Sequence, residues 1–102
     1  REFLHVNDAS RAVILLFEQF HKNEIVNVGP GEDISIKDLA KIISNKINYN
    51  GKILWDKSMP DGMRRKSLDI KILKKLKFKT KISLKKGINK TILEYKELSA
   101  SN

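Results

Sequence analysis

The stretch over residues 9–20 constrains the fold most, because it holds too many apolar side chains for a helix with a single buried face. All six residues from Ala12 to Phe17 are apolar, and in a helix they point all around the axis. We predict a helix here, with Asn7 or Asp8 as its capping residue. One face can pack on the chain's own segments, and the other, which includes Leu15 and Leu16, needs a further cover. Without that cover, the chain should self-associate or stay loosely packed.

Three shorter segments predict β-strands, because each is an apolar or alternating run that ends in turn-forming residues. They are residues 1–6, 25–28 and 52–56. Residues 78–82 are predicted to form an extended connector.

Three further helices are predicted where a capping residue precedes apolar residues at helical spacing. Ser35 opens a helix that runs to about Ile47, with Asp38 in a variant of the capping box. Asp69 caps a short helix and Ser83 caps the last one. The side chains expected to face inward are Ile36, Leu39, Ile42, Ile43 and Ile47, then Ile72, Leu73 and Leu76, and finally Leu84, Ile88, Ile92 and Tyr95. The predicted fold is α/β, a single domain over residues 1–102 with short strands and about four helices.

The composition excludes several classes of protein. Charged residues make up 32% of the chain and apolar residues 40%, which is typical of a folded domain rather than of a disordered segment. The absence of cysteine excludes disulfides and thiolate chemistry. His5 and His21 are the only histidines, and without a third ligand at suitable spacing we expect no metal site. The chain begins at Arg1 with no signal-peptide pattern, so we expect a fragment of a cytoplasmic protein.

The net charge of +9 is concentrated in the second half of the chain. Between Arg64 and Lys96 there are thirteen lysines and arginines, against only Asp69 and Glu94. Such an excess can mark a surface for nucleic acid or for an acidic membrane. Few aromatic residues are interleaved to stack on bases, and the lysines follow helical spacing. We therefore predict a solvated face, with no membrane partner and with nucleic acid only as an alternative.

Residues 60–66, Pro-Asp-Gly-Met-Arg-Arg-Lys, predict an exposed loop. Pro60 presets the backbone for a turn, the Asp61 side chain can bond its own backbone, and Gly62 tolerates positive φ. The plainer interpretation is a solvated basic turn before a helix. The alternative is a site for an anion that also carries hydroxyl groups, since arginines grip phosphate and a carboxylate accepts from OH or NH donors.

The Gly29-Pro30-Gly31 sequence is predicted to be a plain turn. The third glycine of the dinucleotide fingerprint is missing, because Ile34 occupies its place. Pro30 also removes one of the amides that would face a phosphate.

Several motifs together resemble the GDP-L-fucose synthases, a family of extended short-chain dehydrogenases/reductases within the NAD-dependent epimerases/dehydratases. The matching segments keep the family's order and spacing over nearly the whole chain. They are Arg-Glu-Phe-Leu-His-Val-Asn-Asp at 1–8, Asn-Val-Gly at 27–29, Ile-Ser-Ile at 34–36, the loop and its continuation at 60–69, and Ile-Ser-Leu at 82–84 with Gly87. The opening motif is shared widely among nucleotide-sugar epimerases and dehydratases. The Pro-Asp-Gly loop with the following Arg-Lys is more specific to the fucose synthase branch.

The resemblance implies a homodimeric parent enzyme that converts GDP-4-keto-6-deoxy-D-mannose to GDP-L-fucose by epimerisation and NADPH-dependent reduction. This chain is similar to its C-terminal third, much of the substrate domain, without the N-terminal Rossmann cofactor domain. The family's catalytic tyrosine and lysine lie four residues apart, whereas Ile53 follows Tyr49 and Ser99 follows Tyr95 at that spacing. We therefore expect no catalytic and no cofactor-binding residue here, and an inactive isolated fragment.

The resemblance carries four substrate-binding residues onto this chain. Arg1 matches the family arginine that binds the nucleotide-sugar, and we expect it to contact the diphosphate. Asp61 matches a second substrate ligand, suited to accept from guanine or ribose donors. Arg65 and Lys66 match the residues beside it and are expected to support binding.

Three departures from the family pattern predict a less rigid loop. Met63-Arg64 replaces the usual Thr-Pro, Lys77 stands where a helix-ending glycine is common, and Thr80 replaces a proline. Two alternatives remain beside the GDP-sugar interpretation. One is a fragment of another nucleotide-sugar epimerase or dehydratase, and the other is a basic nucleic-acid-binding module.

Overall fold

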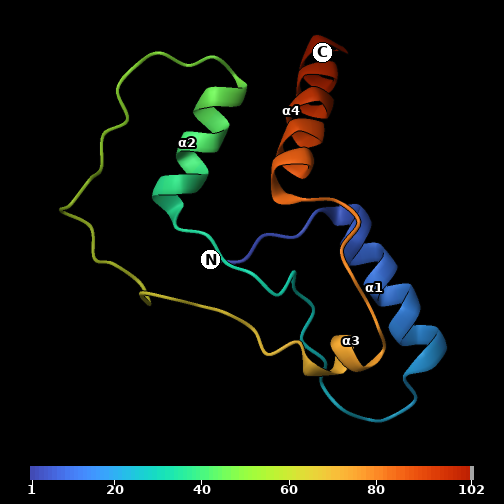
Figure 1. The fold of residues 1–102 in the computed structure, drawn as a ribbon. Helices are drawn as coiled ribbons and strands as arrows, with labels where there is room; N and C mark the ends of the chain where they lie inside the picture. The colour runs from blue at the N-terminus through green and yellow to red at the C-terminus, as the bar shows by residue number, and fades with distance from the viewer. Residues whose placement is uncertain (102) are drawn as a thin grey trace.

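The computed structural model describes residues 1–101, and its regular structure over that range is helical (Figure 1). The four helices are α1 (Val6–Gln19), α2 (Ile36–Lys46), α3 (Lys71–Lys75) and α4 (Leu84–Ser101). Helices α2 and α4 contact each other, and the segment between α2 and α3 runs as a long arc outside the helices. The prediction of four helices is confirmed.

The three predicted strands are wrong, because residues 1–101 contain no strand. A strand needs a neighbour to pair its N–H and C=O groups, and an apolar surface to cover one face. Residues 25–28 and 52–56 find no such surface in this part of the chain, since Ile25 is 95% exposed and Leu54 is 86% exposed. At the start of the chain, only Arg1 exchanges backbone hydrogen bonds in both directions, with Ile34. The fold of these residues is therefore α-helical with extended segments, and not α/β.

Helix α1 begins earlier than predicted, and neither Asn7 nor Asp8 is its cap. His5 occupies the N-cap position, where its Nδ1 accepts a hydrogen bond of 3.1 Å from the Asn7 backbone. His5 therefore has a structural role at the start of α1. The Asp8 side chain turns inward and is fully buried. It accepts from the backbone N–H groups of Lys81 and Ile82, both at 3.0 Å, which joins α1 to the connector before α4.

The capping predictions for α2 and α4 are confirmed, whereas the one for α3 is wrong in its residue, because Ile70 and not Asp69 occupies that N-cap position. The Ser35 hydroxyl accepts from the Asp38 backbone at 3.0 Å, and the Ser83 hydroxyl accepts from the Lys86 backbone at 3.3 Å. The Asp69 carboxylate accepts from the first amide of α3, at Lys71, over 2.9 Å. These contacts satisfy amides that would otherwise lack an intrahelical partner.

Two helices end in left-handed residues that are not glycine. Asn48 follows α2 with φ of 55°, and Lys77 follows α3 with φ of 61°. At α3, the Lys77 amide donates to Lys74 and the Phe78 amide donates to Leu73, which is the hydrogen-bond pattern of the Schellman motif. Lys77 therefore occupies a backbone position where glycine carries no steric cost.

The described chain is open, and little of it is buried. Its radius of gyration is 16.7 Å, against about 13 Å for a compact domain of this length. Its accessible surface is 8774 Å², against about 5,900 Å² for a compact protein of 11.7 kDa. Ala12 and Leu73 are the fully buried apolar residues of the described part. A large share of the surface is therefore available to contact other polypeptide.

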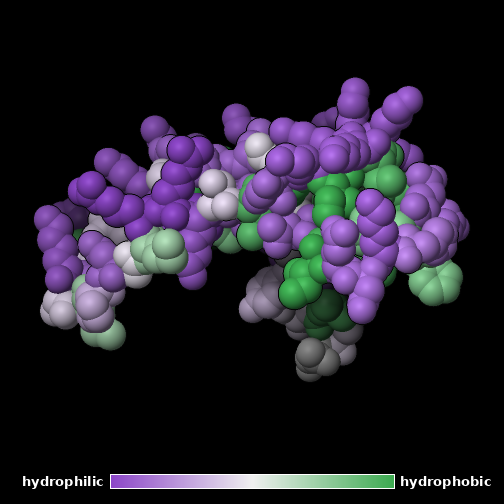
Figure 2. Space-filling view, turned by 90° about the horizontal axis from the view of Figure 1, so that it is seen from below, coloured by the Kyte–Doolittle hydropathy of each residue, from purple (hydrophilic) through white to green (hydrophobic). Residues whose placement is uncertain are grey.

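Apolar side chains are exposed on helix α1, as the sequence predicted, but at other positions. Val13 is 61% exposed and Phe17 is 84% exposed, whereas Leu15 and Leu16 are half-buried. Tyr95, expected to face inward in α4, is 70% exposed. On the face shown in Figure 2, apolar side chains gather over one half of the molecule, while the other half, on the side of the long arc, is mostly hydrophilic.

Candidate functional site

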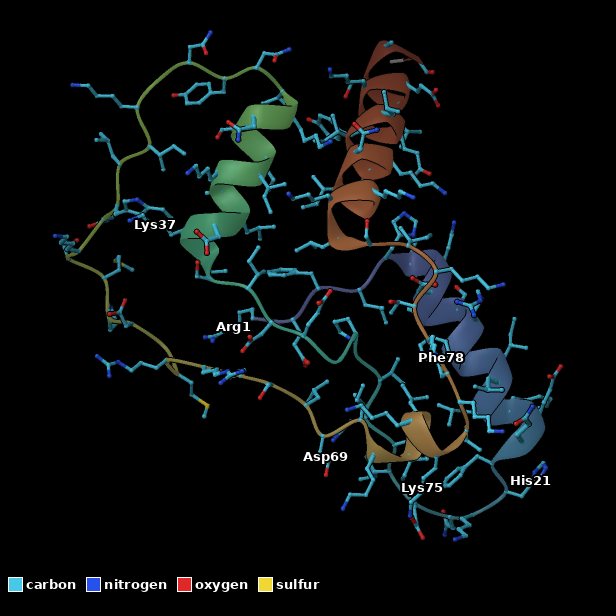
Figure 3. All side chains as sticks on the ribbon, viewed as in Figure 1. Arg1, His21, Lys37, Asp69, Lys75 and Phe78 are labelled. Atoms are coloured by element: carbon cyan, nitrogen blue, oxygen red, sulfur yellow. The ribbon has the colours of Figure 1, made fainter. Side chains whose placement is uncertain are left out.

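Two of the predicted substrate-binding elements lie against each other in the structure. The Arg1 guanidinium donates through Nη1 to the carbonyl of Met63, over 2.9 Å, although the two residues are 62 positions apart. A Cβ atom at Gly62 would lie 3.4 Å from Nη2 of the same arginine, so the absence of a side chain there leaves room for the guanidinium. Arg1 thus links the N-terminal segment to the loop at residues 60–66 (Figure 3).

The backbone of Arg1 is held by the segment that follows the Gly29–Gly31 turn. The amino group of Arg1 donates to the carbonyl of Ile34 over 2.8 Å, and the amide of Ile34 donates back over 2.9 Å. Arg1 is half-buried as a result. The arginine therefore has a defined place relative to the loop.

Arg65, on the loop, forms an ion pair with Asp33. Its Nε atom donates to Oδ2 of the carboxylate, which is less exposed than the guanidinium, at 25% against 74%. The hydrogen bond and the charge of Arg65 lower the pKa of Asp33 below its ordinary value. The carboxylate in turn raises the pKa of Arg65. Asp33 directly precedes Ile34, so adjacent residues hold Arg65 and Arg1.

The far end of the loop is tied down by two more contacts. The Glu2 carboxylate accepts from the Leu68 amide over 2.9 Å, and the Asn27 side chain donates to the Asp69 carbonyl over 3.2 Å. A Cβ atom at Gly29 would lie 3.3 Å from Oε2 of Glu2 and 3.4 Å from Leu68, which explains why this buried position suits glycine. The loop is therefore anchored on the segments 1–5 and 27–34.

Asp61 and Lys66, the remaining predicted ligands, lie exposed on the loop. Neither side chain makes a hydrogen bond or an ion pair with any residue in 1–101. The site thus presents the Arg1 guanidinium beside a loop that carries Arg65, Lys66 and the unpaired carboxylate of Asp61. Cations of this kind bind phosphate oxygens, and a free carboxylate accepts from hydroxyl or N–H donors.

The sequence did not single out Asp33 and Glu2, whose carboxylates hold the loop. Asp33 follows a turn and Glu2 sits inside the opening motif, but neither pattern indicates a partner more than 30 residues away.

The described residues also contain an apolar cleft and a glycine-proline-glycine turn. An apolar cleft of about 240 Å³ lies between the N-terminal segment and α4, and no predicted site residue lines it. Among residues 1–101, no three acidic or histidine side chains come together as a metal site. The Gly29–Gly31 turn does not fit a dinucleotide, because the next helix starts only at Ile36 and Pro30 lacks an N–H.

No helix of the described part combines the length and the apolar character needed to cross a bilayer.

Comparison with curated proteins identifies relatives along nearly the whole chain. The chain is 41% identical over 97 residues to "Probable GDP-L-fucose synthase 1" of Oryza sativa subsp. japonica, and the aligned residues cover 95% of this chain and 30% of that protein. It is 38% identical over 100 residues to "GDP-L-fucose synthase" of Escherichia coli strain K12, covering 89% of this chain and 31% of that protein. A "Putative UDP-glucose 4-epimerase" of Methanocaldococcus jannaschii is 36% identical over 92 residues, covering 90% of this chain and 30% of that protein. No protein-family model matches the chain.

These relatives place the chain among proteins that are named as nucleotide-sugar synthases and epimerases. Within that group, the chain belongs to the GDP-L-fucose synthase family and corresponds to the C-terminal portion of its members. The resemblance seen in the motifs is thereby confirmed. The chain spans about 30% of the length of the curated relatives it matches.

Proposed function

We propose that residues 1–102 form the substrate-binding domain of a GDP-L-fucose synthase-type enzyme and bind a GDP-sugar. The observation that carries the proposal is the contact between Arg1 and the loop at Met63. It brings together two segments that the sequence resemblance assigns to the same ligand. Arg65 and Lys66 lie on the same loop, so the cations needed to neutralise a diphosphate come from neighbouring positions.

Each of the four residues has a distinct role in this proposal. Arg1 and Arg65 bind diphosphate oxygens, because a guanidinium presents several donors in a rigid fork. Lys66 adds a mobile charge beside them. Asp61 accepts hydrogen bonds from the guanine or ribose, since its carboxylate is free of protein partners in the described chain.

The parent enzyme in this proposal converts GDP-4-keto-6-deoxy-D-mannose to GDP-L-fucose in the cytoplasm, as a homodimer. NADPH supplies the hydride there, and its site lies outside this chain. The residues of this chain bind and orient the nucleotide end of the substrate, which leaves the sugar free to face the reacting groups. Holding the substrate in this way lowers the entropic cost of the reaction.

A second candidate is a fragment of another nucleotide-sugar epimerase, which the similarity to the Methanocaldococcus protein favours. The arginines and Lys66 would bind the diphosphate of either nucleotide. Asp61 is the residue that separates the two candidates, because it is proposed to contact the nucleoside.

Calorimetric titration of the chain with GDP, with UDP and with duplex DNA tests the proposal. We expect saturable GDP binding that is tighter than UDP binding and that changes only moderately with salt. Equal or tighter binding of UDP would favour the epimerase. Binding of DNA alone, falling steeply as salt rises, would instead indicate a nucleic-acid module.

A further inference from the structure

We propose that Asp33 is a positioning residue that fixes Arg65 for the diphosphate, and that Asp33 and Ile34 act together as the support for both arginines of the site. This inference rests on the proposed function. Asp33 itself does not contact the ligand in this arrangement. It sets the direction in which the Arg65 guanidinium points.

Asp33 binds Arg65 in a way that leaves the terminal nitrogens of the guanidinium available. Asp33 engages Arg65 through Nε, the nitrogen nearest the side-chain stem. Within residues 1–101, the terminal nitrogens Nη1 and Nη2 have no hydrogen-bond partner. A guanidinium held through Nε keeps these terminal donors available, and they can bind two oxygens of a diphosphate at once.

Fixing a long, exposed arginine side chain costs conformational entropy. Arg65 is 74% exposed, so without a partner it would sample many rotamers and lose that freedom on binding. The carboxylate of Asp33 is better shielded, and it projects from a segment whose next residue pairs with Arg1. Asp33 therefore restricts the arginine before the ligand arrives, which is how preorganisation raises affinity.

Asp33 and Ile34 support both arginines of the site. Ile34 holds Arg1 through its backbone and Asp33 holds Arg65 through its side chain, so two adjacent residues hold two cations from distant segments. A shift of residues 33–34 would therefore displace both arginines.

The test is a set of calorimetric titrations with GDP at neutral pH and low salt, on the 102-residue chain. Asp33→Asn keeps the shape but removes the charge, and we expect about tenfold weaker binding. Asp33→Glu restores the carboxylate and should recover most of the affinity. Glu32→Gln is the matched control, since it neutralises the exposed neighbour, and it should bind as the wild type does. Circular dichroism confirms that each variant keeps the helical content of the wild type.

A double-mutant cycle separates positioning of Arg65 from a general effect on the fold. In an Arg65→Ala background, Asp33→Asn should cause no further loss of GDP binding, because its effect acts through that arginine. An equal loss in both backgrounds would overturn the assignment. So would an Asp33→Asn variant that binds GDP as well as or better than the wild type, since the carboxylate would then be neutral or a competitor. Absence of GDP binding by the wild-type chain would instead contradict the proposed function, and the role of Asp33 with it.

Discussion

The carboxylate of Asp8 accepts the backbone amide of Ile82 at 3.0 Å, across 74 positions of sequence. The neighbouring amide of Lys81 donates to the other oxygen at the same distance, and Arg11 pairs with the carboxylate at 2.7 Å. Arg11 also lies 5.3 Å from the centre of the Phe78 ring. In Figure 3, Phe78 lies on the connector where it passes α1. Asp8 is therefore the main polar link between α1 and the connector that leads to α4.

Asp8→Asn should lower the free energy of unfolding by about 2 kcal/mol. The substitution removes the charged acceptor of the Lys81 and Ile82 backbone N–H groups, and these groups stay buried. Urea denaturation followed by circular dichroism measures this change. Asp56→Asn is a suitable control, since that exposed carboxylate accepts only from Ser58 in its own loop. Equal stability of the two variants would show that the Asp8 link contributes nothing special.

The same link predicts how stability depends on pH. Burial raises the pKa of Asp8, but the hydrogen bonds from Lys81, Ile82 and Arg11 and the charge of Arg11 outweigh it, so the pKa lies below its ordinary value. Such a group stabilises the fold fully above the ordinary carboxyl pKa of about 4, and the stabilisation is lost as the pH falls through the lower folded value. The urea midpoint should fall in that acidic range, and the fall should be smaller in Asp8→Asn.

Lys77→Gly should stabilise the chain by about 0.5–1 kcal/mol. Lys77 has a φ of 61°, a conformation that is strained for a residue with a Cβ atom and unstrained for glycine. Glycine loses more conformational freedom on folding, which offsets part of this gain. Lys74→Gly, inside α3, is the control and should destabilise by about 1 kcal/mol instead. Thermal melting of both variants measures the difference. If Lys77→Gly melts lower than the wild type, the strain assigned to this helix end is absent.

The helices could be predicted because their signals are local. Ser35 and Ser83 lie three residues from the amides they cap, so sequence spacing alone indicates them. The segments predicted as strands carry the apolar pattern of strands, but a strand exists only with a partner, and residues 1–101 provide none. The roles of Asp8 and Asp33 could not be predicted, because their partners lie 74 and 32 positions away. For the site, only the family resemblance connected Arg1 with the loop.

Phe17→Lys should reduce self-association of the chain. The Phe17 side chain is 84% exposed on α1, next to the exposed Val13, and burying such side chains contributes roughly 1.5–3 kcal/mol each. We expect wild-type sedimentation to increase with concentration, together with binding of a hydrophobic dye. Phe17→Lys should weaken both effects, while Gln19→Lys, with the same added charge on the same helix, should not. A monomeric wild type that binds no dye would mean that this face needs no cover.

The isolated chain should neither bind NADPH nor catalyse reduction or epimerisation. The Gly29–Gly31 turn is unsuited to a dinucleotide, and the family resemblance assigns the cofactor and the catalytic residues to a segment outside this chain. Fluorescence of NADPH titrated with micromolar protein measures binding directly. Saturable enhancement would show that a cofactor site exists within these residues.

Comparison of GDP affinity between the wild-type chain and Asp61→Ala tests the central claim most directly. Asp61 is exposed and makes no hydrogen bond within the described residues, so its replacement should leave helical content and melting temperature unchanged. Because a carboxylate makes charge-assisted hydrogen bonds to the nucleoside in our proposal, the dissociation constant for GDP should rise about tenfold or more. Lys57→Ala, on the same exposed arc, should leave it unchanged. An Asp61→Ala variant that binds GDP with the wild-type dissociation constant would contradict the assignment of this loop to the GDP-sugar.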